Sequence, residues 1–522
     1  MTESNKNNNG KEDLTGKERF AWNVIASWAG YIFVLIPGFI MPRLISDYQG
    51  SSALGVWDFT WAFVNYLRIS GFGIGSSVNR YVAKHRIEGD FEALRNTIST
   101  VTVIQVVIAI FVLLATVFFS YWLPIEFADS LGEHQDEVPG LVLFLGGSLA
   151  LYFAFDSFRG VITGYHRWDV HNGIVAFMHG TNFVLMAIVL IAGGSLFDIA
   201  MTYFFVTVAG EISRAYWAFR LCPELRIRFS YLSWKRAKKM ISFGMKTSLA
   251  GLPVILVLQS TSVLVMSSLG AAALAIYARP IALIRHLGTF VSKYSFVLIP
   301  MAGSIQANKN KSELIDFFLD STKYGLSFTL PPVLFLVVYG DRILYYWMGE
   351  GYADWQLIAV LSLGYLLPIS QNSVMTILSG LNAHGKAAML SLGTAGLFYI
   401  GGAIYIESIG WSLLAAALLV SITLTLSQGV VVPLYACHYL KIPVTHYLYR
   451  VFTAPMMCGL VYFLIMIFVR WMWPDRPDLA MLIGGGLGAI VMLPIYWVWI
   501  APDSFKHKII KKLQKKTAKA AG

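Results

Sequence analysis

Long apolar runs separated by short polar stretches fill the sequence from about residue 20 to residue 500. A membrane-spanning helix needs roughly 20 consecutive apolar residues. Runs of that length predict fourteen spans, at residues 20–45, 53–82, 97–122, 138–164, 169–194, 197–221, 238–268, 272–303, 314–340, 355–382, 387–407, 411–437, 446–471 and 478–500. The pattern therefore predicts an all-α polytopic membrane protein.

The composition agrees with this fold class and removes several others. Hydrophobic residues make up 57% of the chain and charged residues only 13%, with a mean hydropathy of +0.62. A soluble domain carries about 25% charged residues. A soluble enzyme, a disordered chain and a disulfide-stapled secreted protein are excluded. The net charge of +11 is not gathered into one stripe, so we expect no nucleic-acid partner.

The distribution of the basic residues instead indicates how the chain is oriented in the membrane. With the N-terminus in the cytoplasm, only four of the 40 Lys and Arg fall on the outer side, and the outer segment 123–137 is acidic with no Lys or Arg. The positive-inside rule then places both termini in the cytoplasm, in a multi-pass inner-membrane protein. The polar segment 1–18 precedes an uncleaved first helix. The lysine-rich tail 501–522 is either an amphipathic helix on anionic lipid or a solvated topogenic tail.

An internal repeat divides the chain into two similar halves. The pattern at Ser52–Asp58 returns at Ala272–Ala278, and two further matches downstream keep nearly the same offset. Six spans separate the copies, so we expect two six-helix lobes related by a pseudo-two-fold axis along the membrane normal, plus a C-terminal pair. The expected domains are the N-lobe 19–222, a basic cytoplasmic linker 223–236, the C-lobe 237–440 and the terminal pair 441–500.

Charged residues at membrane depth are the strongest functional signal. Arg68 lies about 24 Å along the second span from its outer end, and Arg285 about 20 Å along the repeat-equivalent eighth span, so both are near the midplane. Arg279 and Lys293 flank Arg285 on one helix, and Lys246 lies on the seventh span. A buried Arg or Lys costs about 2.5–3.5 kcal/mol unless it pairs, snorkels or meets water.

Acidic residues in the spans are too few to neutralise these cations. Asp156 and Glu211 each have an Arg three residues on, which favours local pairing and leaves Asp58, also a candidate for ion coupling. One interpretation is that the cations snorkel or bind backbone carbonyls. The other is a water-filled cationic cavity between the lobes that binds an anionic substrate. We take the second as the working hypothesis.

Aromatic residues and prolines on the same helices add two further predictions. Trp57, Trp61 and Tyr277 are candidates for stacking on sugar rings, although aromatic side chains also serve as packing or interfacial anchors. The hinge candidates are Pro37, Pro253 and Pro280, each of which removes a helix hydrogen bond when it lies inside a helix. A static kink at these prolines is an equally open interpretation.

Two runs resemble motifs that bind cofactors, but the residues around them do not fit those motifs. The run Gly380–Lys386 resembles a phosphate-binding loop, but Ala387 replaces the required Ser or Thr. The run Gly71–Gly75 lies inside a membrane helix and is not a dinucleotide fingerprint. The three cysteines have no metal-ligand spacing, and no long outer loop could carry an active site. We expect no cofactor, no metal and no enzymatic activity.

Several segments resemble a known superfamily of transporters. The stretch from Leu54–Trp57 through Gly71–Ser77 to Arg80–Ala83, together with Leu298–Ala302 and Gly380–Asn382, is similar to polysaccharide flippases. These belong to the multidrug/oligosaccharidyl-lipid/polysaccharide exporter superfamily, which includes O-antigen flippases. The resemblance covers roughly residues 18–500. It implies twelve core helices in two lobes plus two more, around a V-shaped cationic cavity.

The resemblance implies a function. The leading hypothesis is a flippase that moves undecaprenyl-diphosphate-linked oligosaccharide to the outer leaflet by alternating access, for surface polysaccharide biosynthesis. Its expected partners are the anionic lipid-linked oligosaccharide, membrane lipids and the polysaccharide polymerase and chain-length machinery. The alternatives are a lipid II flippase, a drug–cation antiporter of the same superfamily, and a membrane enzyme such as a polymerase or ligase.

Overall fold

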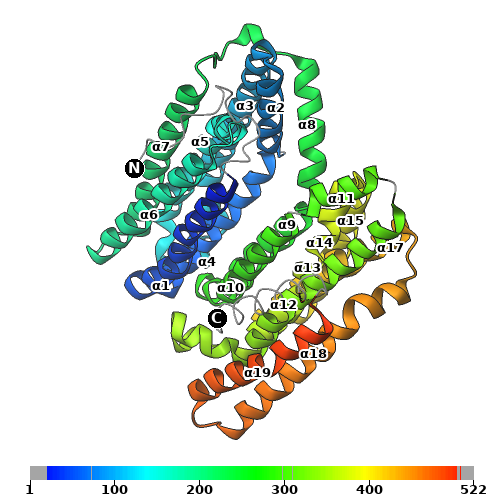
Figure 1. The fold of residues 1–522 in the computed structure, drawn as a ribbon. Helices are drawn as coiled ribbons and strands as arrows, with labels where there is room; N and C mark the ends of the chain where they lie inside the picture. Colours follow the sequence, from blue (N-terminus) through cyan, green and yellow to red (C-terminus); the bar gives the residue numbers. More distant parts are fainter. Residues whose placement is uncertain (1–19, 72, 297, 309, 502–505, 507–522) are drawn as a thin grey trace, which may run out of the picture. The chain divides into compact units, whose positions relative to one another are not determined.

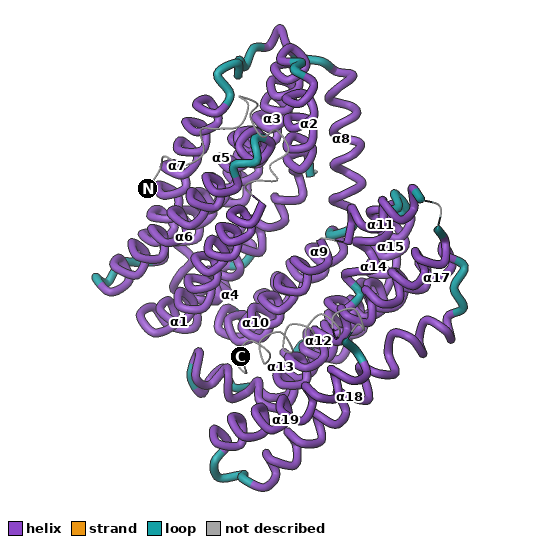
Figure 2. The backbone as a smooth tube through the Cα atoms, in the orientation of Figure 1, coloured by secondary structure: helices purple, strands orange, loops and turns teal. Residues whose placement is uncertain are grey.

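The protein is built from helices alone over the residues that the structure, a computed structural model, describes: 20–71, 73–296, 298–308, 310–501 and 506. Figure 2 shows helices joined by short loops, with no strand in these ranges. The all-α prediction is confirmed. The predicted N-terminal segment 1–18 and nearly all of the basic tail 501–522 lie outside the described residues.

The chain forms two compact units, which we describe separately. The first extends to Ser248 and the second begins at Leu249. The first unit thus includes the segment 223–236, which the sequence suggested as a linker, and almost all of the helix that follows it. The division falls beside the short break that separates this helix from the next one.

The first unit packs around one central helix. Its helices are α1 (Phe20–Leu67), α2 (Ile74–Glu88), α3 (Phe91–Glu126), α4 (Ala128–Leu131), α5 (Val138–Gly164), α6 (Trp168–Ile191), α7 (Leu196–Leu221) and α8 (Trp234–Leu249). Helix α5 contacts α2, α3 and α7, while α1 pairs with α6 (Figure 1). Close approach depends on glycine, because a Cβ at Gly160 or Gly164 would overlap Val78 or Val82 of α2. Small residues permit such approach between membrane helices.

The second predicted span, 53–82, is interrupted near its middle. Helix α1 continues through Gly50, whose φ of 88° is non-helical, and ends at Leu67. A 3₁₀ turn, Arg68–Gly71, follows, and Gly73 then adopts a left-handed conformation before α2 begins. Irregular backbone at membrane depth is tolerated only where protein or water satisfies its polar groups. The break therefore marks a place where the chain is enclosed by protein or exposed to water.

The second unit contains the remaining helices and two further interruptions among the described residues. Its helices are α9 (Leu252–Leu269), α10 (Ala271–Phe296), α11 (Leu298–Ala307), α12 (Lys311–Met348), α13 (Trp355–Ser370), α14 (Asn372–Gly380), α15 (His384–Ile409), α16 (Leu413–Leu424), α17 (Val432–Leu440), α18 (Val444–Met472) and α19 (Pro477–Trp499). A turn at Gln371 separates α13 from α14, and a π-helical segment, Thr425–Val431, joins α16 to α17.

The terminal pair α18 and α19 packs on α12. The Tyr339 hydroxyl donates to the Met466 carbonyl at 2.8 Å, and the ring lies against Gly484, where a Cβ would overlap it. At one end of this contact Arg470 forms two hydrogen bonds to Asp341, at 2.9 and 3.1 Å. These contacts attach the pair to the second unit.

Twelve helical segments in the described part are long and apolar enough to cross a membrane. Fourteen spans were predicted, and two differences account for the gap. Helix α1 joins the first predicted span to the outer part of the second, and α10 is too polar to be counted because it carries Arg279, Arg285 and Lys293. The polytopic fold class is confirmed.

Candidate functional site

Arg68 occupies the break in the second predicted span. It is the first residue of the 3₁₀ turn that follows α1, and its side chain is exposed. Its guanidinium carbon lies 6.0 Å from the centre of the Tyr152 ring on α5. Within the described part of the chain no carboxylate forms an ion pair with it. The predicted midplane cation is therefore present without a neutralising partner.

Tyr152 lies between two arginines. The guanidinium carbon of Arg159 is 5.6 Å from the centre of the same ring that Arg68 approaches. Cations within about 6 Å of an aromatic centroid are attracted by its quadrupole. The ring thus holds two positive groups on the face of the unit where the helix is broken.

A buried carboxylate sits against this cluster. Asp156 is 4% exposed; its Oδ1 lies 2.6 Å from Arg159 Nη2, and Gln105 Nε2 donates to its Oδ2 at 3.0 Å. A Cβ at Gly75, in the first turn of α2, would overlap this carboxylate. The negative charge consequently faces the N-terminal end of α2, where the helix dipole favours it. Asp156 secures the start of α2.

A second buried pair lies on α7. Arg214 Nη1 contacts both carboxylate oxygens of Glu211, at 2.6 and 2.7 Å, and both side chains are almost fully buried. The predicted local pairs Asp156–Arg159 and Glu211–Arg214 are therefore confirmed. These acids neutralise arginines of their own helices. They leave the charge of Arg68 uncompensated.

Aromatic side chains share the helical face of Arg68. Residues 57, 61 and 68 fall within about 40° of one another at 100° per residue. The rings of Trp57 and Trp61 meet edge to face at 6.3 Å, and Trp61 meets Tyr203 of α7 at 5.4 Å. Both tryptophans are half-buried, as is Asp58 beside them. Trp57 and Trp61 thus lie on one face of α1, and Arg68 follows in the turn at the end of this helix.

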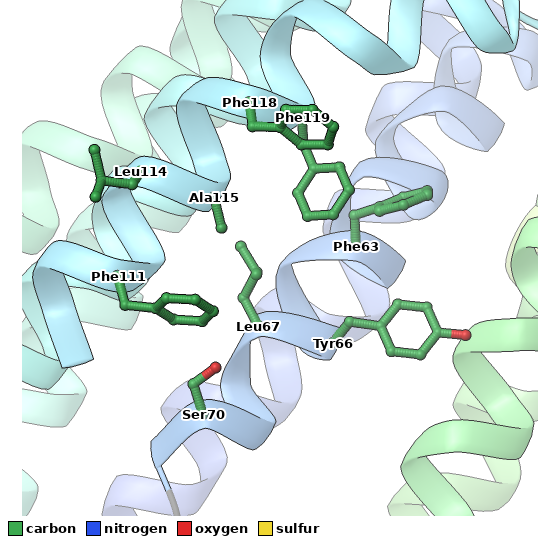
Figure 3. A pocket seen from close by; sticks show the side chains of 9 residues that line it. All are labelled: Phe63, Tyr66, Leu67, Ser70, Phe111, Leu114, Ala115, Phe118 and Phe119. Carbon is green, nitrogen blue, oxygen red and sulfur yellow. The ribbon is translucent and has the colours of Figure 1, made fainter.

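An apolar pocket lies on another side of the same helix. It has a volume of about 610 Å³ and opens between the end of α1 and the middle of α3 (Figure 3). Its lining is Phe63, Tyr66, Leu67, Ser70, Phe111, Leu114, Ala115, Phe118 and Phe119. None of these side chains is charged, and Arg68 does not line the pocket. The space suits a hydrocarbon chain and not a charged group.

In the second unit the candidate residues of α10 differ in how exposed their side chains are. Arg285 is exposed and Lys293 half-buried. Tyr277 is fully buried and Arg279 is 3% exposed, with Arg279 Nε donating to the Ala275 carbonyl of its own helix at 3.3 Å. Arg285 is thus the candidate on α10 that is open to a ligand in this conformation. Lys246 belongs to α8, and its side chain is outside the described part.

The candidate hinge prolines do not occupy equivalent positions. Pro37 lies inside α1 and Pro280 inside α10, as predicted. Pro253 is in the first turn of α9, where its missing N–H removes no helical hydrogen bond. The predicted seventh span is interrupted between α8 and α9 just before this proline, and its role as a hinge stays a prediction.

Sequence reasoning missed Tyr152, Gln105 and the contact at Gly75. The glycine run Gly71–Gly75 was the available signal, since three glycines in five residues of a membrane helix mark a break or a close approach. It was considered only as a nucleotide motif. Among the described residues no group of His, Cys, Asp and Glu could hold a metal ion, and all three cysteines are buried and free.

Comparisons with known proteins agree on the type of molecule. Residues 17–306, more than half of the chain, match the profile of a family described as "Polysaccharide biosynthesis protein". A protein of Shigella flexneri, provisionally named as an O-antigen transporter, is 22% identical over 382 residues, covering 71% of this chain and 85% of the relative.

Two solved structures share the fold. The lipid II flippase MurJ, in an inward closed conformation, has a TM-score of 0.69 and 14% identity, covering 91% of this chain and 99% of its own. An inward-facing multidrug resistance MATE family transporter of the MOP superfamily has a TM-score of 0.64 and 15% identity, covering 79% and 94%. At these identities the likeness establishes the fold, which is that of the superfamily identified from the sequence.

Proposed function

The chain belongs to the polysaccharide biosynthesis protein family, and we propose that it moves undecaprenyl-diphosphate-linked oligosaccharide from the inner to the outer leaflet by alternating access. The proposal places it in the inner membrane with both termini in the cytoplasm, as the distribution of Lys and Arg indicates. Under this proposal the protein is a transporter and not an enzyme. The protein supplies the glycan to a polymerase and its chain-length partner.

The observation that carries the proposal is the unpaired cation at the helix break. Arg68 is exposed, its guanidinium carbon lies 6.0 Å from the centre of the Tyr152 ring, and the nearby Arg159 is already paired with Asp156. A guanidinium binds phosphate oxygens through two parallel hydrogen bonds. A diphosphate offers the negative charge that the protein's own carboxylates do not provide to Arg68. In the second unit, Arg285 of α10 is another exposed cation.

The surroundings of Arg68 match the other parts of such a substrate. Trp57 and Trp61 lie on the same face of α1, where their rings can pack against sugar rings. The apolar pocket between α1 and α3 offers about 610 Å³ to a hydrocarbon chain. Removing a chain from water is favourable by about 0.8 kcal/mol per CH₂, so this part stays in apolar surroundings throughout transport.

A second candidate function is transport of lipid II. The fold likeness to MurJ extends over 91% of this chain. Lipid II also joins a polyprenyl diphosphate to sugars, so Arg68 serves it equally well. A drug–cation antiporter fits less well, because a cationic drug needs cavity carboxylates and the buried acids Asp156 and Glu211 are already paired with arginine. Rescue of a strain depleted of its lipid II flippase separates the two flippase functions.

The test is complementation of a strain that lacks this gene. We expect Arg68→Ala and Arg285→Ala to reach wild-type levels in the membrane yet to abolish surface polysaccharide, with lipid-linked glycan accumulating at the cytoplasmic face. The matched control is Arg342→Ala, because this arginine lies in the predicted outer part of the chain. Full polysaccharide assembly by the Arg68→Ala and Arg285→Ala variants would overturn the proposal.

A further inference from the structure

Residues 226–239 overlap the predicted linker 223–236 and are called the linker segment from here on. Hydrogen bonds hold this segment along the first turns of α3. Ser99 Oγ donates to the Arg226 carbonyl at 3.0 Å, and the Ser233 N–H donates to Thr100 Oγ1 at 3.1 Å. Arg236 Nη1 donates to the Ala93 carbonyl at 2.7 Å. The segment is therefore held to the body of the first unit, although it precedes the division between the units.

These contacts set the depth of the segment in the membrane. Ser99 and Thr100 are buried residues at the start of the predicted span 97–122, in the apolar helix α3. The predicted orientation places this end of α3 on the cytoplasmic side. With this orientation we expect the linker segment at the level where α3 enters the inner leaflet, in the headgroup region.

Three large apolar side chains of the segment are exposed. Phe229 is 82% exposed, Trp234 is 74% exposed and Leu232 is 41% exposed. Ala237 and Met240, at the start of α8, are buried and form the packed side. A soluble surface rarely presents large apolar residues together, and such patches mark interaction sites.

Positive charge alternates with these apolar residues. Residues 226–239 contain six Lys and Arg and no Asp or Glu. The side chains of Arg226, Arg228, Lys235 and Lys238 are exposed. Aromatic rings beside cations are the composition of segments that lie in the membrane interface, with rings at the acyl boundary and cations on anionic headgroups.

We propose that the linker segment is a binding surface for anionic phospholipid headgroups of the inner leaflet. Phe229, Leu232 and Trp234 enter the acyl boundary, and the exposed Arg and Lys bind the headgroup phosphates. The surface anchors the chain just before it passes to the second unit. The proposal does not depend on the transported substrate. It follows from hydrogen bonding, exposure and charge in the first unit.

The experiment labels Trp234→Cys with an environment-sensitive fluorophore in the full-length protein. The native cysteines are buried, and wild-type protein treated in the same way gives the background. The labelled protein is reconstituted in nanodiscs of phosphatidylcholine, with or without phosphatidylglycerol. We expect a blue shift and quenching by lipids spin-labelled near the headgroup, both enhanced by phosphatidylglycerol and weakened by ~1 M NaCl, where the Debye length is about 3 Å.

Two controls separate the parts of the proposal. The first control adds Lys235→Gln and Lys238→Gln to the labelled Trp234→Cys protein. Its blue shift and lipid quenching should then depend little on phosphatidylglycerol, because two lysines near the surface change the affinity for anionic lipid about 30-fold. A label at Ser312→Cys, exposed between Lys311 and Glu313 at the start of α12, should show no such dependence. Phe229→Cys repeats the test at an independent position.

The outcomes are decisive in both directions. Blue shift and lipid quenching that rise with phosphatidylglycerol at positions 229 and 234 support the proposal. A label that stays in water in both lipids overturns it, as does equal insertion with and without phosphatidylglycerol. Protection of the label by a soluble partner, without quenching by lipid, also overturns it in favour of a protein interface.

Discussion

The carboxylate of Asp156 in α5 occupies the space that a side chain at Gly75 in α2 would need. Glycine at this position lets the first turn of α2 rest directly on a buried negative charge, which Arg159 pairs and Gln105 hydrogen-bonds. The contact lies beside the helix break that carries Arg68. Packing at Gly75 thus fixes the backbone on which the proposed phosphate-binding arginine depends.

Gly75→Ala should destabilise the first unit. The added methyl overlaps Asp156, and overpacking of this kind costs about 1–3 kcal/mol. The expected result is a lower thermal midpoint of unfolding in detergent. Gly173→Ala in α6 is the matched control, because no atom lies within 4 Å of the new Cβ. There the gain in helix propensity of about 1 kcal/mol should leave the midpoint equal or higher, and equal destabilisation by both variants would contradict the assignment.

The buried pair Glu211–Arg214 should couple strongly. Removing one partner leaves a charge unpaired, so each single change to Gln should destabilise the protein by more than the double change. A double-mutant cycle should give an interaction energy of about 1–3 kcal/mol. The exposed pair Arg43–Asp47, at the same separation of 2.6 Å, should give below about 1 kcal/mol. Similar values for the two pairs would show that burial does not strengthen the first.

The pKa of His85, at the end of α2 outside the membrane spans, should respond to Arg236. Burial, followed by the positive charge of Arg236, lowers this pKa from its ordinary value of 6.5. The neutral form is therefore favoured in the folded protein. The resulting stability is complete above about pH 6.5 and is lost as the pH falls toward the lower folded pKa.

Arg236→Gln should accordingly raise the pKa of His85 toward 6.5. The pH range over which the protein loses this stability should become narrower. NMR titration of the imidazole protons measures the shift. Lys84→Gln is the control and should change the pKa less, because Lys84 is the weakest of the charged contributors acting on His85. A larger response to Lys84→Gln than to Arg236→Gln would contradict the position of Arg236 beside the first turns of α3.

The sequence was informative where the determining interactions are local. Apolar length placed α5, predicted at 138–164, at the bounds observed. Spacing of three residues correctly paired Asp156 with Arg159 and Glu211 with Arg214. In both cases the relevant contacts lie within one helix, so helical geometry was sufficient.

Long-range packing could not be predicted in the same way. Helical periodicity placed Arg279 and Arg285 within an arc of about 120° on one helix, but it gave no information on which neighbours cover Arg279. The position of Tyr152 between Arg68 and Arg159 depends on how α5 meets the broken helix. The break itself follows from the glycines at 71–75, whose effect depends on the close approach of α5.

Transport by purified protein in liposomes tests the role of Arg68 most directly. A fluorescent polyprenyl-diphosphate-linked oligosaccharide is placed in the bilayer, and its translocation is followed by an impermeant quencher. Loss of a charged hydrogen bond costs about 1.5–3 kcal/mol, so Arg68→Ala should slow transport about 10- to 150-fold. Arg68→Lys should retain part of the rate, and Arg342→Ala all of it. Transport by Arg68→Ala at the wild-type rate would contradict the account.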